Sequence, residues 1–169
     1  MTVIKAMISE DLLFLLAQNV RNFTFESRKD VQTIFSHVLR FKIPQSTEPD
    51  PPVISYIVNH RPEIVTELCR GYETTHSAMP CGAILREALK VDFITAIVLY
   101  DQSRPGEPAV RLTNLGPQSG SQDGSGVFWK FFDWIDRGTF EVSADAFATF
   151  RVCCLFQYAL LDGTLLTNL

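Results

Sequence analysis

Glu141 and Asp145 are the two side chains whose types and spacing come nearest to acid–base chemistry. They stand four residues apart in TFEVSADAFATFR, residues 139–151, so a helix would place both carboxylates on one face. Two neighbouring carboxyl groups can act as general acid and general base. The same spacing is more typical of a solvated acidic face, and we therefore interpret the pair as solvent-exposed.

Other motifs that carry out catalysis are missing from the sequence. The segment GSGVFWK, residues 124–130, lacks the phosphate-binding glycine pattern, and there is no G-x-S-x-G, H-E-x-x-H or EF-hand loop. The three histidines stand alone without metal-ligand spacing, and the four cysteines contain no C-x-x-C, which indicates reduced, mostly buried thiols. We predict a protein without catalytic activity, cofactor, metal or small-molecule substrate.

The composition is typical of one folded domain. Of the 169 residues, 46% are apolar and 20% are charged, which supplies enough apolar material for a core. A net charge of −4 with scattered basic residues argues against a nucleic-acid partner. The N-terminus lacks both a signal-peptide pattern and a run of about 20 apolar residues, so we expect no membrane span and a cytoplasmic location.

Helical periodicity dominates the chain, and no stretch is convincing as a strand. Apolar residues recur at intervals of three and four, as in Ile34, Phe35 and Val38. The pattern predicts helices over 10–23, 25–43, 52–60, 62–72, 77–91, 92–101, 127–138 and 139–151. Ser9 is the expected N-cap of the first and Ser77 of the fifth. The segment 92–101 is nearly all apolar, so we expect it to be central and buried.

Successive short helices cannot each bury an apolar face alone, and stacking solves this. We therefore predict an all-α, armadillo/HEAT-like stack of helical hairpins, a partial solenoid; a compact helical bundle explains the same pattern about as well. Glycine, proline and serine crowd residues 103–126, which predicts a flexible loop. We expect an armadillo-like domain over 1–151, interrupted by this loop, and a separate tail over 152–169.

The aromatic residues between 128 and 150 are the most unusual feature of the sequence. Phe128, Phe131 and Phe132 form a stripe that we expect to be internal, with two tryptophans beside it. These rings cannot all share one narrow stripe, and aromatic side chains left at a helix surface are favoured anchors at protein interfaces. Core packing explains most of the cluster, and a partner contact at its edge is the alternative.

Four blocks of sequence resemble, in this order, the Mo-25-like scaffold family, also called the calcium-binding protein 39 family. The blocks are DVQTIFSHVLR, YIVNHRPEIVTELCRGYE, CGAILREALK and FWKFFDWIDRGTFEVSADAFATFR. The last block is similar to the fungal, HymA-type members. The resemblance covers residues 8–103 and 126–151, and it implies an armadillo-like stack without catalytic activity. No calcium-binding loop is found, despite the second family name.

The resemblance also implies partners. Members of the family bind protein kinases and pseudokinases on a concave face and hold them in the active shape. In fungi they are tied to germinal-centre-type kinases, polarity, cell separation and conidiophore development. Phe140 matches a family aromatic implicated in kinase contact, and Trp134 and Arg137 are further candidates for partner binding. This would leave Phe147 and Phe150 packed inside; alternatively, Phe140 only packs against the preceding helix.

The sequence also departs from the family. Its members are longer, helices expected before residue 8 are missing, and the residues after about Arg151 differ, so the chain resembles a partial copy. The region that grips a pseudokinase tail lies in the part that differs, and we do not expect that function here. The alternative function is a generic armadillo/HEAT-like interaction module with non-kinase partners. A small helical enzyme would need a catalytic constellation that this sequence lacks.

Overall fold

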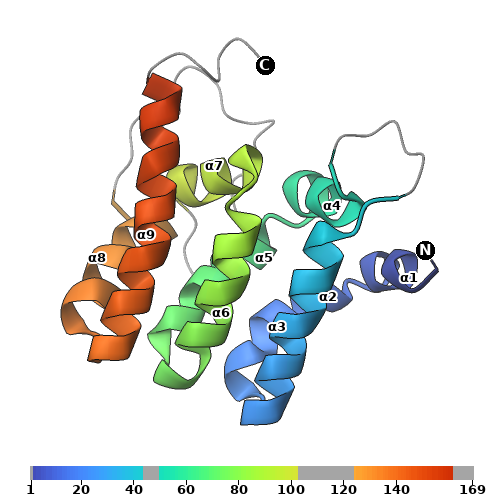
Figure 1. The fold of residues 1–169 in the computed structure, drawn as a ribbon, viewed down its shortest axis with the longest axis horizontal. Coiled ribbons are helices and arrows are strands. Elements are labelled where there is room, and N and C mark those ends of the chain that lie inside the picture. Colours follow the sequence, from blue (N-terminus) through green and yellow to red (C-terminus); the bar gives the residue numbers. More distant parts are fainter. Residues whose placement is uncertain (1, 44–49, 103–123, 162–169) are drawn as a thin grey trace.

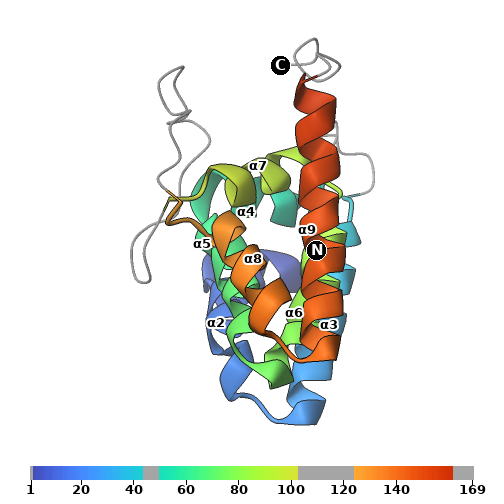
Figure 2. The ribbon, with the colours of Figure 1, turned by 90° about the vertical axis from the view of Figure 1, so that its left-hand side faces the viewer.

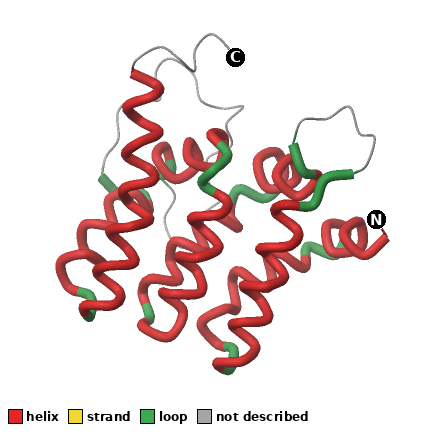
Figure 3. The backbone as a smooth tube through the Cα atoms, viewed as in Figure 1, coloured by secondary structure: helices red, strands yellow, loops and turns green. Residues whose placement is uncertain are grey.

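The computed structural model describes residues 2–43, 50–102 and 124–161, with the backbone alone for residues 2 and 156–161. These residues form nine α-helices, two 3₁₀ helices and no strand (Figure 3), which confirms the all-helical prediction. The α-helices are α1 (Thr2–Ser9), α2 (Leu12–Asn19), α3 (Phe25–Arg40), α4 (Pro52–His60), α5 (Glu63–Arg70), α6 (Thr75–Ala88), α7 (Asp92–Tyr100), α8 (Val127–Arg137) and α9 (Phe140–Leu161). The 3₁₀ helices are η1 (Val20–Asn22) and η2 (Gly71–Glu73).

The helices repeat in groups of three. In each group one helix, α1, α4 or α7, is followed by two more, and in the second and third groups these two pack against each other, α5 on α6 and α8 on α9. Figures 1 and 2 show two layers, with α2, α5 and α8 in one and α3, α6 and α9 in the other. In the second layer, α6 packs against both α3 and α9. The arrangement is an armadillo-like stack, and not the compact bundle that the sequence left open.

Apolar side chains from all three groups form one core between the layers. Phe35, Ile64, Ile97 and Phe131 have no exposed surface. Burying side chains of this size contributes about 1.5–3 kcal/mol each relative to leaving them in water. Helix α7 lies at the centre, because it packs against α4, α5, α8 and α9, and this confirms the prediction made from its apolar sequence.

The third helix of every group begins directly after a threonine, at Thr24, Thr74 or Thr139. The Thr24 hydroxyl accepts a hydrogen bond from the Ser27 amide, and the Thr139 hydroxyl accepts one from the Val142 amide, each at 3.4 Å. Both bonds satisfy an amide that has no partner within its own helix. The starts of α3 and α9 are therefore capped in the same way, whereas the Thr74 hydroxyl lies 2.5 Å from the Ser77 hydroxyl and caps no amide of α6.

Both predicted N-caps are wrong. Ser9 ends α1, a helix that the sequence analysis did not predict, and its hydroxyl donates to the Ala6 carbonyl. The chain then turns at Asp11, whose φ of 53° lies in the left-handed region, before α2 begins. Ser77 is buried inside α6, where its hydroxyl donates to the Gly71 carbonyl at 2.6 Å. Each serine hydroxyl donates to a carbonyl earlier in the chain. A sequence pattern does not distinguish such a serine from one that caps the following helix.

The end of α7 and the start of α8 are held together by the residues that flank them. The Val127 amide donates to the Asp101 carboxylate at 3.1 Å, and this bond caps the start of α8. A Cβ at Gly126 would lie 1.7 Å from the Asp101 carbonyl oxygen, so only glycine allows this approach. The predicted flexible loop at 103–126 falls largely outside the described residues, as do residues 44–49 and 162–169.

Helix α9 continues past Arg151 to Leu161. Cys153, beyond the expected domain boundary, is fully buried in the core. The division into a domain over 1–151 and a tail over 152–169 stays a prediction. Among the helices that the structure describes, none combines the length and the apolar character that a bilayer crossing requires.

Candidate interaction site at the start of helix α9

Phe140 is the first residue of α9 and projects from the turn that joins α8 to α9. It is 89% exposed, more than any other large apolar residue that the structure describes. Thr139 caps the helix directly before it. The expected exposure of Phe140 is confirmed, and little of its surface is left for packing against α8. Its role as a partner contact stays a prediction.

The other two candidates lie on α8 in different environments. Trp134 is half-buried: its ring stacks on Tyr72 with centroids 5.5 Å apart and meets Phe131 edge-on at 5.0 Å. Arg137 is exposed, and among the described residues its ion-pair partner is Asp133, one turn earlier on α8, at 3.6 Å. An exposed pair of this kind is weak, so the guanidinium is available to another carboxylate. The structure thus places Arg137 and Phe140 on the surface and leaves Trp134 half-buried against the core.

The aromatic stripe is only partly internal. Phe128 and Phe131 are buried as predicted. Phe132 is 49% exposed and Phe147 is 51% exposed, so the prediction that these two pack inside is wrong. Phe150 is half-buried, and its ring lies 5.4 Å from Phe128 and 5.1 Å from Phe132.

Smaller residues explain why Phe147 points outward. The face of α9 that turns toward the core carries Val142, Ala146, Thr149 and Cys153, all buried. Such small side chains let α9 approach α6 closely. The aromatic residues of α9 therefore lie on the faces that remain, beside α8 or in solvent.

A buried polar network fixes α9 against η2 and α6. The Tyr72 hydroxyl donates to the Asp145 carboxylate at 2.5 Å and lies 2.8 Å from the Thr149 hydroxyl. Arg86 of α6 forms an ion pair with Asp145 at 2.8 Å and donates to Thr149 at 3.0 Å. Asp145 is 7% exposed, so its charge is buried and paired. Buried groups satisfied in this way specify one arrangement of the helices around them.

Burial and the hydrogen bond to Asp145 keep Tyr72 protonated. Both effects raise the pKa of Tyr72, with burial the larger. The protonated hydroxyl can therefore donate at every physiological pH. Gly82 leaves the space for this contact, because a Cβ there would lie 1.8 Å from the Asp145 carboxylate and 2.3 Å from the Tyr72 hydroxyl.

The interpretation of Glu141 and Asp145 as one solvated face is wrong for Asp145. Glu141 is exposed, whereas Asp145 turns inward to Tyr72 and Arg86. The two carboxylates therefore do not form a pair for acid–base chemistry. The sequence carries no local signal for the network, since its partners stand 59 to 77 residues apart in the chain.

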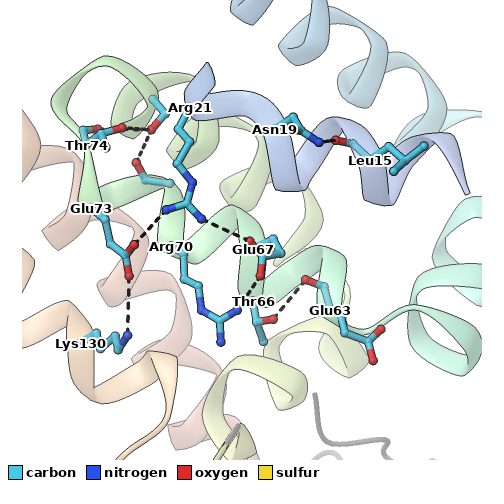
Figure 4. Close-up of polar contacts among 12 residues, drawn as sticks. Leu15, Asn19, Arg21, Glu63, Thr66, Glu67, Arg70, Glu73, Thr74 and Lys130 are labelled. Atoms are coloured by element: carbon cyan, nitrogen blue, oxygen red, sulfur yellow. Dashed lines mark hydrogen bonds and ion pairs between the residues drawn. The ribbon is translucent and has the colours of Figure 1, made fainter. Parts of the chain in front are cut away.

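A chain of charges crosses the other layer and joins its helices (Figure 4). Arg21 of η1 lies 3.7 Å from Glu67 of α5 and 3.2 Å from Glu73 of η2. Glu73 also lies 3.6 Å from Lys130 of α8. Arg70 is buried beside Glu67 at 2.5 Å. Partly exposed ion pairs contribute about 0–1 kcal/mol each to the free energy of unfolding. Their main effect is therefore to fix the orientation of the three helix groups relative to one another.

The thiols have the environment that the sequence predicted. All four cysteines are free, three are buried, and Cys154 is half-buried. Burial raises the pKa of Cys81 and of Cys153 to about 12, so neither is a nucleophile at neutral pH. Within residues 2–43, 50–102 and 124–155, no three His, Cys, Asp or Glu side chains gather as metal ligands would.

Comparison with known proteins settles the family. The sequence matches the Mo25-like family over residues 1–168. This chain belongs to that family. The match includes most of residues 152–169, and it is wider than the resemblance seen in the sequence blocks at 8–103 and 126–151.

Three relatives show how much of a Mo25-like protein this chain represents. It is 63% identical to the conidiophore development protein hymA of Emericella nidulans over 166 residues, which are 98% of this chain and 43% of hymA. It is 31% identical to human calcium-binding protein 39-like over 143 residues (85% of this chain, 34% of the relative). It is 30% identical to MO25-like protein 2 of Caenorhabditis elegans over 141 residues (83% and 33%). The chain thus spans less than half the length of these relatives.

The Mo25-like family is a family of non-catalytic scaffold proteins with an armadillo-like helical fold. The layered helices of this chain agree with that fold. Membership confirms the predictions of family, fold class and a protein that is not an enzyme. The residues that the sequence analysis missed, Tyr72, Arg86 and Thr149, hold the helix that carries Phe140.

Proposed function

We propose that this chain is a scaffold that binds a protein kinase or pseudokinase and holds the kinase in its active shape. The support is its family and its 63% identity to hymA, whose name links that relative to conidiophore development. The partners would be germinal-centre-type kinases or pseudokinases in the fungal cytoplasm, in polarity, cell separation and conidiophore development.

Phe140 is the observation that carries this proposal. Aromatic side chains that are exposed in the free protein and held on a rigid element are favoured centres of binding energy. Phe140 is 89% exposed, and α9 is fixed by the buried contacts of Asp145 with Tyr72 and Arg86. The backbone that carries this ring therefore loses little conformational freedom when a partner covers it.

Arg137 and Trp134 complete the proposed site in different ways. Arg137 is exposed beside the same turn and supplies a positive charge for a carboxylate of the partner. Trp134 is half-buried and its ring stacks on Tyr72, so it fixes the end of α8 next to the turn. The exposed part of its ring can contact the partner.

The test is a titration of this chain with the catalytic domain of a germinal-centre-type kinase and, separately, with a pseudokinase domain. Phe140→Ala should weaken binding at least tenfold, because truncating an interface aromatic often costs more than 1.4 kcal/mol. Its melting temperature should equal that of the unchanged chain. Phe93→Ala is the matched control, since Phe93 is a 41% exposed aromatic on α7.

Kinase activity supplies the second readout. The unchanged chain should raise the phosphorylation rate of the kinase that it binds, and Phe140→Ala should not. If neither kinase nor pseudokinase binds, the proposal is wrong, and a generic interaction module with non-kinase partners takes its place. A large fall in melting temperature for Phe140→Ala would instead return Phe140 to a packing role.

A further inference from the structure

Phe140 has a counterpart at the start of α3. Phe25 follows the cap Thr24 as Phe140 follows Thr139, so both are the first residue of a third helix. Phe25 is 62% exposed, although it is a large aromatic residue. The ammonium of Lys29 lies 4.2 Å from the centre of its ring. This contact holds one face of the ring and leaves the remainder to solvent.

Met79 continues the pattern on α6, the helix between the other two. It is 50% exposed and stands five residues after Thr74, the N-cap position of α6. The first and fifth residues after a cap share a helix face, because they are four apart. In α6 the position of Phe25 and Phe140 is occupied by Thr75, the first residue of the helix. Met79 therefore lies on the same face as this position, one turn further along α6.

The three helices begin at the same end of their layer. Figure 1 shows the starts of α3, α6 and α9 side by side at the lower edge, and α6 packs against both neighbours. Packed helices lie about 8–10 Å apart, so the starts of α3 and α9 are separated by about 16–20 Å. A partner helix rises 1.5 Å per residue, and about 11–14 residues of it span this distance.

The exposed charges around these side chains are mainly negative. Glu26 follows Phe25 and Glu141 follows Phe140, and both are exposed. Among the described residues, Glu141 and Asp30 have no ion-pair partner, and Glu26 has only the exposed Lys29 at 3.5 Å. Three carboxylates therefore outnumber the two exposed cations near the strip, Lys29 and Arg137, and Arg137 is itself paired with Asp133, so the balance complements a basic segment of a partner.

We propose that Phe25, Met79 and Phe140 form one docking strip, and that it receives a basic amphipathic helix of the partner laid across the starts of α3, α6 and α9. The strip rests on the proposed function, since Phe140 belongs to both. It adds Phe25 and Met79 as contact residues and specifies the partner's segment. That segment carries apolar residues on one face, over three to four turns, with lysine or arginine beside them.

Two probes test the strip on the full chain. The first is the catalytic domain of a germinal-centre-type kinase. The second is a synthetic 14-residue helical peptide with leucines along one face and lysines beside them, compared with a peptide that has glutamates in place of the lysines. Each is titrated against the unchanged chain, Phe25→Ala, Met79→Ala, Phe140→Ala and the control Phe93→Ala, with melting temperatures measured alongside.

The expected pattern is specific. Phe25→Ala and Phe140→Ala should each weaken binding of both probes about tenfold or more, and Met79→Ala by a smaller factor. The two aromatic residues share no contact, so the factors should multiply in the double variant. Phe93→Ala should bind as the unchanged chain does, and the glutamate peptide should bind more weakly than the lysine peptide.

The outcomes separate this inference from the proposed function. If the kinase domain binds and only Phe140→Ala weakens it, the strip is wrong and the proposed function stands. If the kinase domain does not bind, the proposed function is wrong, and the lysine peptide decides the strip. The strip is wrong if the lysine peptide does not bind, or if it binds Phe25→Ala and Met79→Ala as tightly as the unchanged chain. It is supported if Phe25→Ala and Phe140→Ala each weaken binding of the lysine peptide.

Discussion

Tyr72 donates a 2.5 Å hydrogen bond to Asp145, and this bond joins η2 to α9. It is buried, and Arg86 pairs with the same carboxylate from α6. The neighbouring elements η2 and α6 therefore meet α9, which is distant in sequence, at one charge. The orientation of α9, and with it the position of Phe140, depends on this charge being fully satisfied.

Tyr72→Phe should destabilise the protein, because the ring still fills its place while Asp145 loses its closest donor. Leaving a buried acceptor short of a partner costs about 1–3 kcal/mol in the free energy of unfolding. Urea denaturation followed by circular dichroism measures the loss. Tyr100→Phe is the control, since no hydrogen bond of the half-buried Tyr100 is found among the described residues. Equal stability of the two variants would mean that the network contributes little.

Gly82→Ala should destabilise the chain, although alanine is favoured over glycine within a helix by about 1 kcal/mol. The new methyl group would lie 1.8 Å from the Asp145 carboxylate and 2.3 Å from the Tyr72 hydroxyl. Crowding of this kind costs about 1–3 kcal/mol, which reverses the sign that helix propensity gives. The melting temperature decides between the two signs: a rise for Gly82→Ala would show that α6 and α9 can separate without cost.

The sequence predicted the structure best for helices whose own apolar spacing supplies the face that packs in the core. The apolar spacing in 25–43 predicted α3, which ends at Arg40, and the segment 52–60 coincides with α4. These helices form because their own residues supply an apolar face for the core. The repeated stacking of such faces also makes the all-helical stack predictable.

Side-chain direction was less predictable, because it depends on the neighbouring helix. Asp145 follows Glu141 by one turn, yet it is drawn inward by Tyr72 and Arg86, which stand far away in the chain. Phe147 is pushed outward because small residues on α9 occupy the contact with α6. Neither neighbour can be identified from the spacing within one helix.

Acid should destabilise the protein through Glu87. Its hydrogen bonds, first from Arg40 and then from Lys90, lower the pKa of Glu87 from 4.5 to about 2. Because the folded pKa lies below the unfolded one, the pair contributes fully above pH 4.5. The contribution is lost as the pH falls toward about 2.

The measurement is the urea midpoint between pH 6 and pH 2 for the unchanged chain and for Glu87→Gln. The variant should be less stable at pH 6 and should lose less stability on acidification. Glu26→Gln, at an exposed site, is the control and should follow the unchanged chain. Parallel curves for Glu87→Gln and the unchanged chain would contradict the prediction.

Phe131 and Phe132 are neighbours in sequence but should respond very differently to truncation. Phe131 has no exposed surface and contacts Tyr72 and Trp134, so Phe131→Ala should cost about 3–5 kcal/mol in the free energy of unfolding. Phe132 is 49% exposed and mainly meets other aromatic rings, such as Phe150, so Phe132→Ala should cost about 0.5–1.5 kcal/mol. Urea denaturation of the two variants measures the difference directly. Similar losses would show that Phe132 is internal, as the sequence pattern alone predicted.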